Sequence, residues 1–99
     1  MRSVRYVGEA RRDEIDLIMR VSRKWGHTAA VKLDNQLESA IQQISRQPLL
    51  FQVVVGRPQL RRCVVTPQTS IFFEVTDEEV VIKSVFDNRM NPDRLSDRE

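Results

Sequence analysis

The sequence contains few of the residues that build metal centres, disulfides and phosphate-binding loops. Its 99 residues include one cysteine, one histidine and three scattered glycines. A single cysteine cannot form an intramolecular disulfide, and one cysteine with one histidine does not complete a structural zinc site. Three separate glycines do not form a glycine-rich phosphate loop. The sequence therefore predicts no metal, no cofactor and no classical nucleotide hydrolysis.

Long apolar stretches are also lacking. No run approaches the roughly 18–20 apolar residues that cross a bilayer, and the N-terminal residues Met1–Arg5 contain no apolar signal core. We therefore expect a cytoplasmic protein that does not contact a membrane. An apolar fraction of 40% in 99 residues allows one modest core. We expect a single domain over residues 1–92 and a polar tail over residues 93–99.

Acidic residues are missing from the middle of the chain. None occurs between Glu38 and Glu74, whereas this segment contains Arg46, Arg57, Arg61 and Arg62. Arginine also makes up 13 of the 16 basic residues, and its planar group suits bidentate contacts with carboxylates or phosphates. Two explanations remain open: a genome that favours arginine codons, or a surface that binds a nucleic acid or an acidic protein.

The first half of the chain has the pattern of a strand followed by two amphipathic helices. Alternation over Met1–Val7 predicts the strand, and apolar residues at helical spacing predict helices over residues 10–25 and 28–46. Gly26 ends the first helix, Thr28 caps the second and Pro48 stops it, so the turn is two or three residues long. The apolar side of the first helix comprises Ala10, Leu17, Ile18, Val21 and Trp25, with Glu14 either at its rim or beside a basic partner.

The second half predicts a meander of three strands. The strands cover residues 60–65, 70–76 and 79–86, with turns at 67–69 and 77–79. Phe51–Val55 is either a short strand or a buried loop. The helical hairpin needs a surface to cover, and the sheet supplies it. The predicted fold is α+β: an N-terminal strand and an antiparallel helical hairpin packed on one face of an antiparallel sheet that ends in the meander.

The titratable residues give little support for acid–base catalysis. His27 lies in the turn between the helices, where we expect it to be exposed, and Cys63 lies within a strand, where we expect it to pack as a small apolar side chain. Asp77, Glu78 and Glu79 lie at a hairpin tip without apolar surroundings that would raise a pKa. We therefore interpret them as solvated turn residues.

Basic side chains on and after the strands are the remaining candidates for a binding site, namely Arg61, Arg62, Lys83 and Arg89. Alternation along a strand sends Arg61 and Arg62 to opposite sides of the sheet. At most one of them joins the helix-free face, and the other lies at an edge. The cluster either binds phosphates of a target or forms surface ion pairs with Glu74 and Asp87, and both alternatives stay open.

Several short motifs, in their order along the chain, resemble the RelE/ParE family of bacterial toxins. They are Ala10-x-x-Asp13, Trp25-Gly26, Pro48, Leu60–Val65, Ile71–Val75 and Val85-Phe86-Asp87-x-Arg89-x-x-Pro92. The resemblance implies the toxin of a type II toxin–antitoxin module, of the kind associated with plasmid stabilisation. It also implies neutralisation by a cognate antitoxin that wraps around the toxin.

Two activities occur in that family. The RelE-like branch cleaves mRNA on the ribosome with basic residues and a C-terminal Tyr or His that moves protons, whereas the ParE-like branch is associated with inhibition of DNA gyrase. Here Arg89 matches the family's arginine after the last strand, and Arg61 or Arg62 matches one on the second strand. No Tyr or His follows His27, and acid–base help is worth about 10²–10⁴ in rate. We therefore predict a ParE-like toxin that binds rather than cleaves, with an mRNA endonuclease and an inactive homologue as alternatives.

Overall fold

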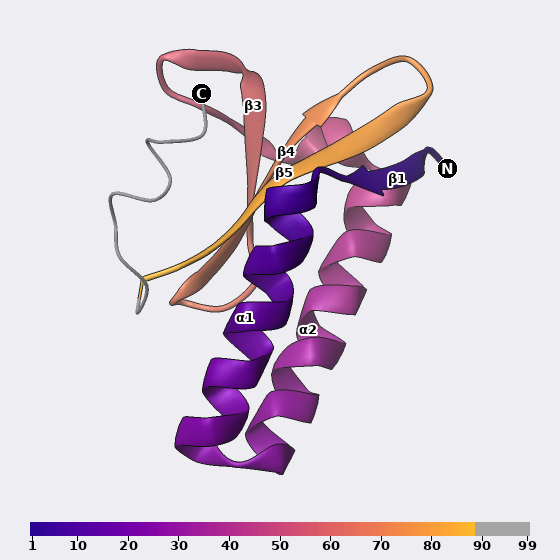
Figure 1. Ribbon diagram of the computed structural model, residues 1–99. Helices are drawn as coiled ribbons and strands as arrows, with labels where there is room; N and C mark the ends of the chain where they lie inside the picture. The colour runs from indigo at the N-terminus through magenta and orange to yellow at the C-terminus, as the bar shows by residue number, and fades with distance from the viewer. Residues whose placement is uncertain (89–99) are drawn as a thin grey trace.

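The computed structural model describes residues 1–88 and shows two helices against one side of a five-stranded sheet (Figure 1). In chain order the elements are β1 (Ser3–Tyr6), α1 (Gly8–Trp25), α2 (His27–Arg46), the 3₁₀ helix η1 (Pro48–Leu50), β2 (Gln52–Val54), β3 (Arg57–Val64), β4 (Thr69–Val75) and β5 (Glu79–Asp87). The predicted α+β architecture is confirmed. The sequence left the segment before the meander as either a short strand or a buried loop, and the structure shows η1 followed by the short strand β2. The predicted tail over residues 93–99 lies outside the described residues.

The sheet is mixed, whereas the sequence predicted antiparallel pairing throughout. The strand order is β1-β5-β4-β3-β2, and every pair is antiparallel except β1 with β5. Parallel neighbours need a long crossover connection, and the helical hairpin and the rest of the sheet lie between these two strands in the chain. Val4 lies beside Val80 and Tyr6 beside Ile82 in this parallel pair. The strand at the start of the chain thus lies against the strand at its end.

The hydrophobic core fills the space between the helical hairpin and the sheet. Its buried apolar members come from both helices and from β3, β4 and β5; they include Leu17, Val21, Leu33, Leu37, Ile44, Cys63, Ile71, Phe73, Ile82 and Val85. Of the predicted apolar side of the first helix, Ala10, Leu17 and Val21 are confirmed as buried. Within residues 1–88 no helix is both long enough and apolar enough to cross a membrane.

The turn between the helices is shorter than predicted. Gly26 has φ 95° and serves as the C-cap of α1 and the N-cap of α2. This left-handed conformation favours glycine, and it lets one residue reverse the chain. Helix α2 therefore begins at His27, and the prediction that Thr28 caps it was wrong. Trp25 also departs from the predicted apolar side, because it is 49% exposed at the hairpin tip, with the Lys24 ammonium 4.8 Å from its ring centroid.

Asp13 is a buried carboxylate that closes the open edge of β5. Strand β1 pairs with β5 only as far as Ile82, so the outer edge of β5 continues beyond its neighbour. Asp13 is 1% exposed, and its Oδ2 accepts hydrogen bonds from the Val85 amide at 3.2 Å and the Ser84 hydroxyl at 3.4 Å. A helix side chain thus supplies the acceptor that a neighbouring strand would have supplied.

Replacing Asp13 by alanine is expected to destabilise the fold. The substitution leaves the buried Val85 amide without this acceptor, which costs about 1–3 kcal/mol. Urea denaturation measures the change as a lower midpoint with an unchanged slope. The control is Asp16→Ala, because Asp16 lies exposed on the same helix and its loss is expected to cost less than about 0.5 kcal/mol. Equal midpoints for the two variants would show that the Asp13 contacts contribute nothing.

Candidate partner-binding surface

Arg62 marks the face of the sheet that the helices leave free. It lies opposite Phe72 in the β3–β4 register, and its guanidinium carbon is 5.8 Å from the centroid of the Phe72 ring. The Arg62 Nε donates a hydrogen bond to the Ser70 hydroxyl at 3.0 Å. Both contacts orient the exposed guanidinium, while its Nη groups make no hydrogen bond within residues 1–88. Arg62 is therefore positioned to bind an anionic group outside the chain.

Lys83 lies at a β-bulge on the other side of β4. The register passes from Phe72 opposite Ser84 to Phe73 opposite Ile82, which leaves Lys83 as the extra residue of β5. At a bulge two consecutive residues can share one side of a strand, and Lys83 is partly exposed there. Arg62 and Lys83 thus come from the two strands that flank β4. We call Arg62, Ser70, Phe72 and Lys83 the basic face.

Arg61 does not join the basic face. It extends to the helix side, where its Nη1 donates to the carbonyl oxygens of Phe51 at 2.7 Å and Leu49 at 3.4 Å. The neighbouring arginines thus extend to opposite sides of β3, as strand alternation predicted, but β3 is not an edge strand. Arg89 lies outside the described residues. Of the four predicted site residues, the structure therefore places Arg62 and Lys83 on the two strands that flank β4, and Arg61 on the helix side of β3.

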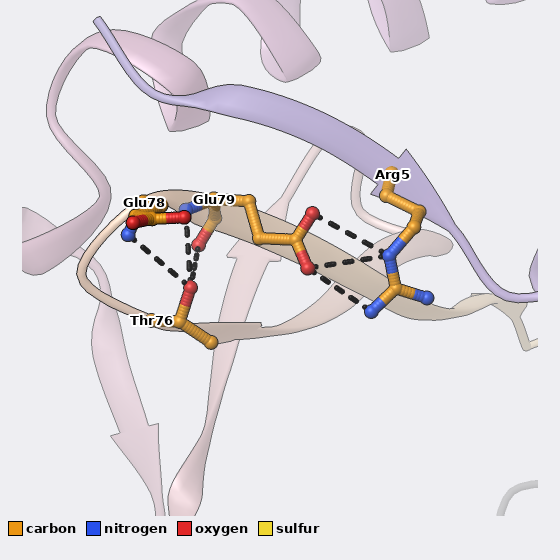
Figure 2. A network of polar contacts seen from close by, with 4 residues as sticks. All are labelled: Arg5, Thr76, Glu78 and Glu79. Carbon is orange, nitrogen blue, oxygen red and sulfur yellow. Dashed lines mark hydrogen bonds and ion pairs between the residues drawn. The ribbon is translucent and has the colours of Figure 1, made fainter.

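In the acidic turn before β5, Asp77 and Glu78 are exposed, as predicted, whereas Glu79 already belongs to β5. Figure 2 shows the Thr76 hydroxyl receiving hydrogen bonds from the amides of Glu78 and Glu79, at 3.4 and 3.0 Å. The Glu79 carboxylate pairs with Arg5 of β1 at 3.1 Å, in a partly exposed contact worth about 0–1 kcal/mol. Asp87, in contrast, is fully buried and accepts a hydrogen bond from the Thr69 hydroxyl at 2.7 Å.

The one tyrosine and the one histidine of the chain both lie away from the basic face. His27 is exposed at the first position of α2, at the tip of the helical hairpin. Tyr6 packs against the helix-side core, lies near the Glu14 side chain and stacks under Arg11, whose guanidinium carbon lies 3.8 Å from the ring centroid. Arg11 is also 3.7 Å from the Glu14 carboxylate, so Glu14 has the basic partner that its position in α1 suggested.

Tyr6 is expected to titrate only at unusually high pH. Burial, followed by the Glu14 charge, raises the pKa of the phenol above its ordinary value of 10.0. The phenol's contribution to stability is therefore fully present below pH 10.0 and is lost as the pH rises through the higher folded pKa. Because the chain has one tyrosine, tyrosinate absorbance reports this residue alone. A midpoint in the folded protein equal to that in denaturant would contradict the burial of Tyr6 beside Glu14.

A groove between α2 and β3 is the second surface feature. Its volume is about 620 Å³, and its lining includes Val31, Asn35, Cys63 and Val64. Val31 and Val64 are 43% and 63% exposed, whereas Cys63 is buried, as predicted, and burial raises the pKa of its thiol. Sequence reasoning missed this groove because the polar side of α2 has the pattern of an ordinary solvated helix surface. The exposed valines were the available signal.

Similar solved structures identify the class of the fold. A protein of the chromosomal ParDE toxin–antitoxin system of P. aeruginosa has a TM-score of 0.74, with 16% identity over 88% of this chain and 96% of that chain. A chain of the E. coli DinJ–YafQ toxin–antitoxin complex has a TM-score of 0.62, with 15% identity over 89% and 93%. A Helicobacter pylori protein solved in solution has a TM-score of 0.60, with 14% identity over 90% and 97%. The fold is that of ParE- and RelE-like toxins.

The family is shown by the sequence itself. The model of the family described as the ParE toxin of the type II toxin–antitoxin system parDE matches residues 4–92. The chain belongs to the ParE toxin family. Among curated protein sequences, none matches it significantly.

Proposed function

We propose that this ParE-type toxin acts by binding its target through the basic face, that the target is DNA gyrase, and that a cognate antitoxin neutralises the toxin. The position of the proton-transfer candidates carries the proposal. Tyr6 and His27 are the only tyrosine and histidine in the sequence, and both lie away from Arg62 and Lys83. A phosphate bound at the basic face would meet the Arg62 guanidinium and the Lys83 ammonium, while the Phe72 ring beside Arg62 is buried. It would meet no tyrosine or histidine that could move a proton, which supports binding without RNA cleavage.

The composition of the basic face suits a macromolecular partner. The Arg62 guanidinium can form two parallel hydrogen bonds with a carboxylate or phosphate, and the neighbouring Phe72 limits the motion of this guanidinium. Arginine and aromatic residues are also enriched where protein interfaces gain most of their binding energy. These properties favour an acidic protein surface as the target.

An antitoxin partner is supported by the structural neighbours and by the groove. Two neighbours belong to toxin–antitoxin systems, one of them solved as a toxin–antitoxin complex. The exposed Val31 and Val64 give the groove an apolar lining, while the amides of Asn35 and Gln36 offer hydrogen bonds beside it. An apolar segment of the antitoxin would cover these valines. Because Val64 lies opposite Ser70 in the β3–β4 register, the segment would also reach the border of the basic face.

A DNA supercoiling reaction tests the proposed target. Purified protein is titrated into gyrase with relaxed plasmid, with and without the antitoxin encoded in the neighbouring reading frame. We expect dose-dependent loss of supercoiling that the antitoxin reverses at about equimolar amounts. The negative control is the charge-reversed variant Arg62→Glu. Full supercoiling activity at a large excess of folded protein would exclude gyrase as the target.

Labelling of Cys63 tests whether the antitoxin occupies the groove. The thiol is the one cysteine of the chain and lines the groove, so a maleimide reagent reacts there alone. We expect slow labelling of the free protein, because burial raises the thiol pKa. Labelling should become slower still in the antitoxin complex. An unchanged rate in the complex would place the antitoxin on another surface, while leaving the test of gyrase unaffected.

A further inference from the structure

A second basic site lies on the helix side of the sheet, beyond the end of α2. Two arginines, Arg2 and Arg61, line one cavity of about 270 Å³ together with Leu49, Gln59, Thr76 and Asp77. The site is separate from the basic face, because Arg61 and Arg62 extend to opposite sides of β3. Its lining includes segments from three places in the chain: the residue before β1, strand β3, and the hairpin between β4 and β5. Only folding brings these segments together.

Main-chain carbonyls hold both guanidinium groups of the cavity. The Arg2 Nε donates to the Thr76 carbonyl at 3.1 Å, and the Arg61 Nη1 donates to the Phe51 carbonyl at 2.7 Å. A guanidinium has five N–H donors, so each arginine keeps further donors for a ligand. Neither arginine forms an ion pair within the part of the chain that the structure describes. Two oriented cations against the single carboxylate of Asp77 leave the cavity with a net positive charge.

The surroundings of the cavity are aliphatic on the side of η1 and acidic on the side of the hairpin, where Glu78 and Glu79 follow Asp77. Leu49 in its lining is 59% exposed, and the nearby Leu50 is 76% exposed. The sequence from residue 39 to residue 73, which supplies η1, β2 and β3, has no acidic residue. A nucleic-acid backbone would place phosphates against these leucines, whereas a peptide can present a carboxylate to the arginines and an apolar side chain to the leucines. The chemistry therefore favours a peptide.

The geometry points to a docking site for an acidic, aliphatic peptide segment: one carboxylate enters the cavity between Arg2 and Arg61, and an apolar neighbour covers Leu49 and Leu50. The segment belongs to the cognate antitoxin, so this inference rests on the proposed function. The docking site would be a specific anchor point for the antitoxin, and it lies on the opposite side of the sheet from the basic face. Binding there would leave the basic face accessible unless another part of the antitoxin covers it.

Calorimetric titration with the antitoxin from the neighbouring reading frame tests the anchor. We expect Arg2→Gln and Arg61→Gln each to weaken binding by about tenfold or more, because each removes one partner of a charge-assisted contact. Arg61→Lys keeps the charge but not the planar guanidinium, so its affinity for the antitoxin should lie between those of the wild type and Arg61→Gln. The matched control is Arg46→Gln, since Arg46 is exposed at the end of α2 and does not line the cavity. Thermal unfolding of the variants verifies that they are folded.

A second measurement separates this inference from the proposed function. The side-chain NMR signals of Arg2 and Arg61 are followed while an acetylated Leu-Glu-Leu-Glu peptide, its glutamine counterpart or a uridine oligonucleotide is added. We expect shifts with the glutamate peptide alone. Wild-type antitoxin affinity in both arginine variants, or shifts with the oligonucleotide and not the peptide, would overturn the inference. If the wild-type toxin fails to bind the antitoxin at all, the neutralisation proposal fails, and the peptide titration still decides whether the cavity binds carboxylates.

Discussion

Charge reversal of Arg62 and Lys83 together is expected to abolish growth inhibition when the protein is induced in a bacterial host. Arg62 is fixed over Phe72 by its hydrogen bond to Ser70, so it presents its charge in one orientation. Placing carboxylates at both positions removes attraction and adds repulsion toward an acidic target. Breaking such charge contacts typically costs about 2–5 kcal/mol, which is more than tenfold in affinity. Growth curves at matched protein levels measure the effect.

The double variant is compared with Arg12→Glu, which makes the same type of charge change on an exposed position of α1. This control is expected to retain toxicity, because α1 packs on the opposite side of the sheet from the basic face. Binding of the cognate antitoxin should persist in both proteins if they are folded. Full toxicity of the Arg62→Glu, Lys83→Glu double variant would remove the basic face from the proposed mechanism.

Replacing Phe73 by alanine is expected to be the most destabilising single change in the chain. Phe73 is completely buried between the sheet and the helices, and its ring lies edge-on to Phe51 at 5.8 Å between centroids. Truncating a buried phenylalanine costs about 3–5 kcal/mol. The total free energy of unfolding of such a domain is about 5–15 kcal/mol. The variant should therefore be partly unfolded or should unfold at a much lower urea concentration.

Two further variants show whether this loss comes from core packing. Phe73→Leu keeps most of the apolar volume and is expected to lose much less stability. Val64→Ala changes a side chain on β3 that is 63% exposed, so it should shift the free energy of unfolding by less than about 0.5 kcal/mol. If Phe73→Ala unfolded at the same urea concentration as Val64→Ala, the described core would be wrong.

Local patterns in the sequence were enough to predict most of the secondary structure and part of the site. Helical spacing located α1 and α2, and short apolar runs separated by turns located the meander. Strand alternation was enough to separate Arg61 from Arg62, because neighbouring residues of a strand point to opposite faces. Each of these predictions depends on residues that are close in the chain.

The features that sequence reasoning missed depend on residues far apart in the chain. The parallel pairing of β1 with β5 joins the first and last strands along the chain. No local sequence pattern indicates whether two such distant strands run parallel or antiparallel. The burial of Asp13 follows from that pairing, because the edge of β5 remains open beyond Ile82. The bulge at Lys83 and the cavity shared by Arg2 and Arg61 likewise arise from register and from contacts between distant segments. Trp25 is exposed because α1 ends at the hairpin tip, where no strand covers it.

Mapping of mRNA ends after induction tests most directly whether this toxin binds rather than cleaves. The protein is induced in a bacterial host, and RNA ends on translating ribosomes are sequenced alongside a reporter of the DNA damage response. The account predicts growth arrest and an induced damage response without new codon-specific mRNA ends. Codon-specific cuts that appear with the wild-type protein and disappear in the Arg62→Glu, Lys83→Glu double variant would contradict it and identify a ribosome-dependent endonuclease.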